Sequence, residues 1–342
     1  MKDSQINKDL LIKTTVNASL CEIRAWIKPG NVHRTRDFPK TKYDDFLKAA
    51  NALANDWTDL FYKIPYSKHS LISPSTIYSD FLMSAVNHVN SVQKGGNVLL
   101  GHLLLMTPLF ISAKYGLENR FPNRDAFWKY CGKIISDSSH SDTIRLFRAI
   151  RMANPGGMGK VDKYDIYDKK SLYQIKKDKV TLLKIFTLSE DRDLISKCLA
   201  TNYEPIRKDY LVRMNKLIDE YPEEYDKMVA ILKRRYIRRD LIKISPKFNE
   251  LIIRLFLYIL SKQPDTLIIR KKGEEAAVKI STKAKELYDS YYTLENTVWF
   301  SELEKFDEQL HEEDGKLNPG TTADILATCI YLNLVYEILG LK

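Results

Sequence analysis

Glycine and proline are scarce in this chain, and they are concentrated at a few breaks between stretches with helical spacing. The 342 residues include 13 glycines and 12 prolines. Glycine is needed where φ is positive or where a ligand approaches the backbone closely. The breaks therefore predict helix ends that present backbone amides to a ligand. They are Pro29-Gly30, Pro155-Gly156, Pro319-Gly320 and, without proline, Lys94-Gly95-Gly96.

The stretches between these breaks repeat apolar residues at the spacing of a helix face. Residues 43–61 follow the i, i+3, i+4, i+7 pattern closely. We find no convincing alternation of period two, no internal repeat and no low-complexity tract. The sequence therefore predicts an all-α fold, a single multi-helix bundle of roughly ten to twelve helices in one domain over residues 1–342. The clearest predicted helices span 10–27, 43–61, 74–93, 97–115, 274–291, 294–311 and 319–339.

Capping residues and turn residues refine these predicted boundaries. Side chains of Ser, Asn and Asp accept the free amides at a helix start, and proline suits the first helical position. Residues 154–175 are predicted to form a long loop, and 170–255 a charged helical segment with few breaks. The expected caps are Ser73, Asn123, either Ser141 or Asp142, and Asn318, which is followed by Pro319.

The composition limits the classes of partner and compartment. Lys and Arg number 54 against 44 Asp and Glu, a net charge of +10. This surplus suits nucleotides, CoA-like molecules, nucleic acid or anionic lipid, although a generally cationic surface explains it equally well. The four cysteines include no CxxC and the six histidines no HExxH, so reduced thiols and no zinc site are expected. The N-terminus lacks the apolar stretch of a signal peptide, which favours the cytoplasm and no membrane partner.

The break near the C-terminus carries the clearest chemical signal. Gly320 and Thr321 would offer free amides at the positive end of a helix, which is a natural site for phosphate. Asp324 lies about one turn further into the helix, too deep for a cap. An N-capped core helix explains Asn318 and Pro319 but leaves Gly320 and Asp324 unexplained.

Three further clusters combine charge with a break. Lys94-Gly95-Gly96 would let a phosphate approach the backbone beside a lysine, and an ordinary tight turn is the equal alternative. Asp265-Thr266 precedes the basic turn Arg270–Gly273, which suits a triphosphate or is simply solvated. Glu22 lies late in a predicted helix, where it opposes the helix dipole. It is either an exposed polar residue or a carboxylate that serves a cation, a metal or catalysis.

The stretch 233–239, Lys-Arg-Arg-Tyr-Ile-Arg-Arg, is the densest basic run. Binding to nucleic acid through phosphate neutralisation is one interpretation. Acidic neighbours at Glu223, Glu224 and Asp240 favour a salt-bridged, solvated helix instead. A non-enzymatic nucleotide- or RNA-binding helical protein is therefore the alternative function, with nucleic acid the less favoured partner. Asp44-Asp45 lacks the DDxxD pattern of all-α prenyltransferases and is discounted.

Taken in order, these motifs resemble the triphosphoribosyl-dephospho-CoA synthase family, which makes the precursor of the citrate lyase prosthetic group. The loop from Pro155 to Asp165 resembles the archaeal branch of that family more than the bacterial enzymes. Gln93 stands where bacterial members have a histidine, and Thr321-Thr322 replaces a Gly-Ser pair. The matching motifs are Glu22 with Lys28-Pro29-Gly30, Lys94-Gly95 with Gly101, Asp265-Thr266, and Leu317–Gly320 with Ala323-Asp324.

The resemblance implies a transferase that moves the triphosphoribosyl group of ATP to the ribose 2′-hydroxyl of dephospho-CoA or a related cofactor precursor, releasing adenine. Its partners would be ATP and a dephospho-CoA-like molecule, and a homodimer is conceivable. A carboxylate would stabilise the oxocarbenium-like transition state. The implied catalytic residues are Glu22, Asp265 and Asp324. The implied phosphate-binding residues are Lys28, Gly30, Lys94, Gly95, Gly96, Arg270, Gly320 and Thr321. Asp162 and Asp165 would hold Mg²⁺ on the phosphates or cap a turn.

Overall fold

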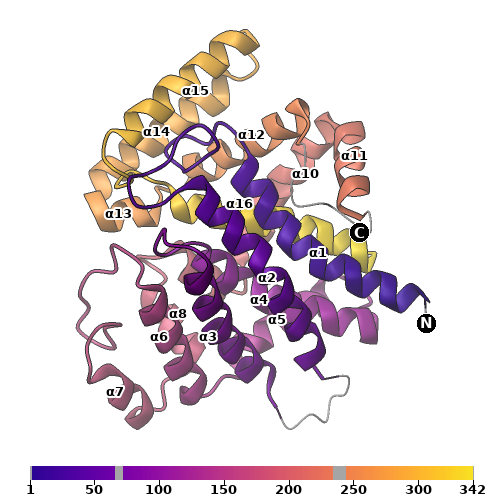
Figure 1. Ribbon diagram of the computed structural model, residues 1–342, viewed down its shortest axis with the longest axis vertical. Helices are drawn as coiled ribbons and strands as arrows, with labels where there is room; N and C mark the ends of the chain where they lie inside the picture. The colour runs from indigo at the N-terminus through magenta and orange to yellow at the C-terminus, as the bar shows by residue number, and fades with distance from the viewer. Residues whose placement is uncertain (1, 66–71, 234–243, 342) are drawn as a thin grey trace.

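The computed structural model describes residues 2–65, 72–233 and 244–341 (Figure 1). Within these ranges the chain forms sixteen α-helices and one π-helical turn, and the only β-type pairing is an isolated bridge between His33 and Arg36. The prediction of an all-α fold is confirmed. The elements are α1 (Lys2–Arg24), α2 (Tyr43–Lys63), α3 (Pro74–Val92), α4 (Leu100–Asn119), α5 (Arg124–Ser136), α6 (His140–Ala153), α7 (Ser171–Lys177), α8 (Leu182–Ser189), α9 (Leu194–Ala200), η1 (Ile206–Tyr210), α10 (Leu211–Glu220), α11 (Pro222–Lys233), α12 (Pro246–Lys262), α13 (Thr266–Lys272), α14 (Glu274–Ser290), α15 (Asn296–His311) and α16 (Gly320–Leu339).

The helices of the described part are more numerous than the ten to twelve that were predicted. The excess lies mainly in the charged segment 170–255, which is divided into short helices. Thr181, Asp193 and Ser245 accept backbone amides and cap α8, α9 and α12. Each cap starts a new helix where the charged pattern suggested continuity. The predicted loop 154–175 is five residues shorter than expected, because α7 already begins at Ser171.

Two of the predicted caps are confirmed. Ser73 and Asn123 accept the amides that begin α3 and α5. The cap of α6 was predicted at Ser141 or Asp142 and is instead Ser139, because Ser139 and Asp142 form a reciprocal capping box.

The predicted start of the last helix is also wrong. α16 begins at Gly320 and follows Pro319 directly, without a side-chain cap, so Asn318 does not cap it. The first helix, predicted to reach residue 27, ends at Arg24. In both places the chain leaves the helix to form the wall of a cavity described below.

Three long helices, α1, α4 and α16, pack against one another at the centre of the molecule (Figure 1). α4 and α16 are buried around most of their circumference, which is typical of core helices. Among the described residues α16 is also long and apolar enough to cross a membrane, but 72% of its most apolar window is buried within the protein. The three helices therefore form the core and fix the relative positions of their ends.

The remaining helices surround this centre. α3 packs on α6, and α12 and α13 pack on α14 (Figure 1). One contiguous apolar cluster extends from α1 to α16. A smaller cluster that includes Phe147, Ile166 and Ile175 supports the 154–170 loop. The four cysteines are free and buried, in agreement with the expectation of reduced thiols.

Candidate active site

A cavity of about 680 Å³ lies where the predicted breaks meet. Its wall receives residues from α1, α4, α6, α8, α9, α13 and the start of α16, and from the loops 25–42 and 154–170. All four breaks come to this region of the molecule, although they are separated by up to 290 residues in the sequence. The residues of the breaks that line the cavity are Lys28, Gly95, Pro155, Gly156 and Gly320.

The first and last Pro-Gly pairs pack directly against each other. Gly30 has a φ of +77°, and a Cβ at this position would lie 3.0 Å from Cδ of Pro319 and 2.9 Å from Cδ1 of Leu310. Only glycine fits this close contact and this backbone conformation. The amide of Gly30 donates to Asp307 Oδ1 at 2.9 Å. This amide, predicted to bind phosphate, is therefore used within the fold.

At one end of the cavity, two carboxyl groups flank an imidazole. His102 Nε2, on α4, lies 3.7 Å from Glu22 Oε2 on α1 and 3.6 Å from Asp324 Oδ1 on α16. His102 Nδ1 lies 3.0 Å from the hydroxyl of Ser19. Because α1, α4 and α16 pack on one another, the three groups are held by the rigid centre of the fold. We call Glu22, His102 and Asp324 the carboxyl–imidazole centre.

Burial controls the protonation of this centre. It lowers the pKa of His102 to about 3, and the Lys28 ammonium adds to this effect. Burial raises the pKa of Glu22, with Lys28 opposing. Burial also raises the pKa of Asp324 well above its usual range, and the negative charge of Glu22 adds to the rise. The centre thus combines a neutral imidazole with carboxyl groups that hold protons more tightly than usual.

Gly101 makes room for the carboxyl group of Asp324. A Cβ on Gly101 would lie 2.0 Å from Asp324 Oδ2 and 2.1 Å from its Cγ, which is far inside van der Waals contact. The sequence motifs singled out Gly101 and Asp324 separately but missed His102. A histidine beside a glycine in an otherwise apolar helix start was the signal that could have identified it.

Lys28 is buried with 1% of its surface exposed, and its ammonium binds Glu22. The same ammonium donates to the carbonyl oxygen of Glu22 at 2.6 Å. Lys28 lines the cavity, but its charge is committed to Glu22. The lysine that was predicted to grip phosphate therefore neutralises the carboxylate instead.

Other cations surround the cavity. Arg270 Nη1 lies 2.9 Å from Asp193 Oδ1, and Lys271 Nζ donates to the carbonyl of Gly315 at 3.1 Å. Burial lowers the pKa of Lys271. Arg270 and Lys271 belong to the predicted basic turn, whereas Lys40, Lys163 and Arg192 were missed because they lie on separate segments. The cavity-lining cations besides Lys28 are Lys40, Lys163, Arg192, Arg270 and Lys271.

Asp265 lies behind the cavity wall. It caps α13 through the amides of Leu267 and Ile268, and it also accepts the amide and hydroxyl of Thr322 at 2.7 and 2.8 Å. Thr266 donates to Thr321 Oγ1 at 3.2 Å. These contacts join the start of α13 to the start of α16.

Four other predicted residues also lie away from this cavity. Lys94 is exposed and lines a separate groove, and Gly96 is exposed with a φ of +78°. Asp162 is exposed. Asp165 accepts the amides of Val161 and Tyr167 at 3.1 and 2.7 Å, which is the turn-capping arrangement.

Two asparagines of the cavity wall have side-chain atoms without a partner. Nδ2 of Asn31 and Oδ1 of Asn318 are buried and make no hydrogen bond within the described residues. Both side chains line the cavity, and Asn31 is only 6% exposed. Buried polar atoms normally have partners, because an unpaired one costs about 1–3 kcal/mol. These two atoms are therefore available to water or to a ligand in the cavity.

The basic run 233–239, which motivated the alternative of an RNA-binding protein, has almost all of its residues outside the described part of the chain. The three central helices and the cavity are formed without it.

The chain matches the family model CitG, ATP:dephospho-CoA triphosphoribosyl transferase, over residues 9–234 and 215–342. No curated protein matches it. Among solved structures, it is similar to an Archaeoglobus fulgidus protein whose crystal structure is described as that of a triphosphoribosyl-dephospho-CoA synthase. The TM-score is 0.55 at 20% sequence identity, over 83% of this chain and 98% of the other. This structural likeness supports the fold, and the family match covers almost the whole sequence.

Proposed function

Because the chain belongs to the ATP:dephospho-CoA triphosphoribosyl transferase family, we propose that the cavity of about 680 Å³ is its active site. The observation that carries this proposal is the carboxyl–imidazole centre, where two carboxyl groups of raised pKa and an imidazole of lowered pKa, from three core helices, meet at the cavity. The reaction breaks the N-glycosidic bond of ATP and joins its triphosphoribosyl group to a ribose hydroxyl. One proton must pass from that hydroxyl to the departing adenine.

Each of the two carboxyl groups carries out one of the two proton transfers. Asp324 has 21% of its side chain exposed and a pKa raised well above the usual range, so it suits the acid that protonates adenine. Glu22 is paired with Lys28 and provides the carboxylate that faces the developing oxocarbenium ion and takes the hydroxyl proton. After the reaction Glu22 is protonated and Asp324 is ionised. His102 lies between the two carboxyl groups, on the path by which the proton returns from Glu22 to Asp324.

Glu22→Gln is expected to keep ATP binding but lower turnover at least tenfold. Glutamine has nearly the same shape as glutamate, but it provides no negative charge for the transition state and cannot accept the proton. Steady-state kinetics together with equilibrium binding of ATP will separate the two effects. Unchanged turnover would remove Glu22 from the catalytic residues.

The triphosphate is best accommodated by the cations of the cavity wall and by the start of α16. Arg270 and Lys271 lie on one short helix, and Arg192 lines the same cavity. The start of α16, at Gly320 and Thr321, adds the positive end of a 20-residue helix. Each charge-assisted hydrogen bond to a phosphate would contribute about 1.5–3 kcal/mol.

The acceptor is best accommodated by the apolar part of the cavity. Its wall combines side chains of α6 and α8 with the 154–170 loop, and Lys163 is the cation on this side. An apolar wall with one cation suits a nucleotide-linked chain such as that of dephospho-CoA. The apolar residues are Leu146, Phe147, Ile150, Met158, Val161, Ile166, Ile185, Phe186 and Leu188.

Asn31→Leu is expected to raise KM for one of the two substrates at least tenfold while the melting temperature stays the same or rises. The leucine has a similar volume and removes a buried amide that has no partner in the described residues. A substrate that pairs with the amide would lose a hydrogen bond. Thermal unfolding and KM for each substrate will be measured on the same preparation. A lower melting temperature with unchanged KM would contradict this role.

Mg²⁺ on the phosphates stays a prediction, but Asp162 and Asp165 do not fit as its ligands. Both oxygens of Asp165 accept backbone amides, and neither residue lines the cavity. Activity in the presence and absence of a chelator will decide whether the reaction needs it.

The assigned activity is tested by incubating the purified protein with ATP and dephospho-CoA and measuring free adenine by chromatography. Adenine and a triphosphoribosylated acceptor should appear in equal amounts. Related acceptors with a ribose hydroxyl are tested in parallel, because they determine whether dephospho-CoA itself is the acceptor of this chain. Release of phosphate without adenine, or no product with any acceptor, would contradict the assignment.

We also propose that the protein acts in the cytoplasm and forms a homodimer. Both proposals rest on the sequence and the family resemblance alone. A molar mass from light scattering tests the dimer, and fractionation of the source cells tests the compartment.

A further inference from the structure

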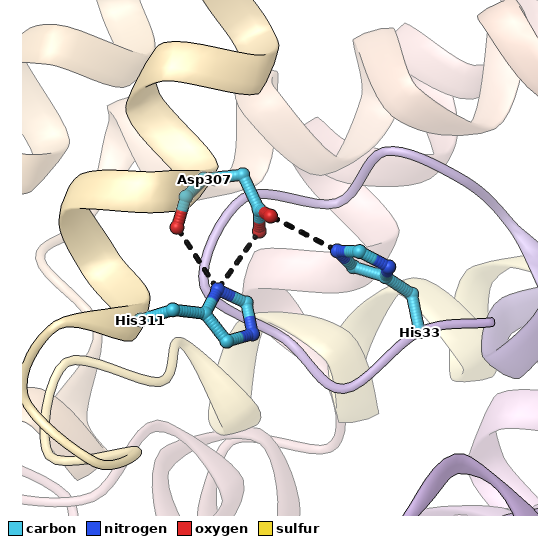
Figure 2. A group of neighbouring side chains, drawn as sticks. All are labelled: His33, Asp307 and His311. Carbon is cyan, nitrogen blue, oxygen red and sulfur yellow. Dashed lines mark hydrogen bonds and ion pairs between the residues drawn. The ribbon is translucent and has the colours of Figure 1, made fainter. Parts of the chain in front are cut away.

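Asp307, on α15, lies at the centre of a buried polar cluster outside the cavity. His33 Nε2 lies 3.0 Å from Asp307 Oδ2, and His311 Nδ1 lies 3.1 Å from Oδ1 (Figure 2). The amide of Gly30 donates to Oδ1 at 2.9 Å, and Arg36 Nη1 lies 3.4 Å from Oδ2. Only 4% of the Asp307 side chain is exposed. We call Asp307 with these four partners the Asp307 cluster.

Three of the four partners belong to the loop 25–42, which is more than 250 residues from α15 in the sequence. The opposite side of this loop lines the cavity, through Lys28, Asn31 and Phe38 among others. His311 adds a second connection, because its ring stacks on that of Phe38 at 5.0 Å with an angle of 29°. Asp307 thus connects α15 to the back of an active-site wall without touching the cavity itself.

Two imidazoles and a carboxylate also resemble the donor set of a transition-metal site, and the three ligand atoms lie within 4.8 Å of one another. In this cluster His33 Nε2 makes a hydrogen bond to the carboxylate, and His311 Nδ1 contacts both the carboxylate and the backbone carbonyl oxygen of Asp307. Arg36 lies against the same carboxylate. A metal ion would have to break these bonds and sit beside a guanidinium. Hydrogen bonding accounts for the cluster better than ligation does.

The charge on Asp307 fits this interpretation. Burial alone would raise its pKa, but hydrogen bonds from His311 and His33 outweigh burial and hold the pKa below its usual range. An ionised carboxylate accepts several strong hydrogen bonds at once. It can therefore hold the loop at several points.

We propose that Asp307 is a positioning residue for the transfer reaction, which fixes the loop 25–42 so that Lys28 and Asn31 keep their places in the cavity. The inference rests on the proposed function of that cavity. Lys28 is two residues from Gly30 and binds Glu22, so a displaced loop would also disturb the carboxyl–imidazole centre. The role of Asp307 is indirect, because it does not line the cavity.

Asp307→Asn tests this proposal, with Asp142→Asn as the matched control. Asp142 is likewise buried, with 1% exposed, and accepts hydrogen bonds from Thr76, Ser79 and Ser139, but it does not line the cavity or contact the loop. Both variants are expected to unfold at lower temperature. At a temperature where both are folded, only Asp307→Asn should lower kcat/KM for adenine release at least tenfold. Only this variant should speed hydrogen–deuterium exchange of residues 26–41.

His33 provides a second test that avoids the charge change. His33→Gln keeps an N–H donor for Asp307 and should retain most of the activity, whereas His33→Ala should lose it. Equal activity of these two variants, or of Asp307→Asn and Asp142→Asn, would overturn the positioning role. So would one equivalent of metal per chain whose removal by a chelator reproduces the Asp307→Asn exchange pattern. An inactive wild type would contradict the proposed function instead, and the exchange measurement would still test the cluster.

Discussion

Asp324→Asn is expected to lower the turnover of adenine release at least a hundredfold while ATP affinity changes by less than threefold. Asparagine keeps the shape of the side chain beside Gly101 but cannot donate a carboxyl proton to adenine. General acid catalysis typically contributes about 10²- to 10⁴-fold, so its loss should dominate the kinetics. The measurement is kcat from chromatographic adenine release, together with ATP binding by calorimetry.

Asp314→Asn is the matched control. Asp314 is also a cavity-lining acid, and its φ of +50° is one that asparagine tolerates as well as aspartate. It is not part of the carboxyl–imidazole centre. Its replacement should change kcat by less than threefold. If kcat falls to the same extent in both variants, the total negative charge of the cavity determines turnover, and Asp324 has no specific role.

The raised pKa of Asp324 adds a prediction about stability. The folded protein holds this proton more tightly than the unfolded chain, so the folded state loses stability as pH rises from the ordinary aspartate pKa through the raised one. Asp324→Asn removes this loss. The variant should therefore match the wild type at low pH and exceed its melting temperature increasingly as pH rises. A constant difference across pH would contradict the raised pKa.

Helical periodicity and breaks were sufficient to predict the all-α fold and the main helices. They could not predict how the segment 170–255 is divided, because Thr181, Asp193 and Ser245 act as caps within a sequence that remains helical in pattern. The cap of α6 depended on the reciprocal bond between Ser139 and Asp142. Such short-range side-chain bonds determine boundaries but leave little trace in the periodicity.

Site residues could be predicted where their residue type had no structural explanation at that position. They were harder to predict where their partners lie on distant segments of the chain. Glu22 and Asp324 were identified because each was out of place in its helix. The sequence could not reveal that Lys28 binds Glu22 or that the amide of Gly30 binds Asp307. His102 was missed because a histidine in a buried helix is usually structural, and only its two carboxyl neighbours distinguish it.

Gly101→Ala is expected to abolish measurable activity and to lower the melting temperature. The new methyl group would lie 2.0 Å from Asp324 Oδ2, so the carboxyl group must leave its place beside His102. Overpacking of this kind costs about 1–3 kcal/mol. Without the clash, alanine would be favoured over glycine in a helix by up to about 1 kcal/mol. Thermal unfolding and adenine release will be measured on the same variants.

A double-mutant cycle with Asp324→Ala tests this prediction further, because the effect of Gly101→Ala on stability should change from a loss to a gain. In the Asp324→Ala background the carboxyl group is gone, so Gly101→Ala should stabilise the protein slightly instead of destabilising it. Activity should stay absent in the double variant, since the acid is missing. If Gly101→Ala destabilises both backgrounds equally, the glycine is needed by the start of α4 itself and not by Asp324. Reversal would establish that Gly101 is glycine in order to make room for the carboxyl group of Asp324.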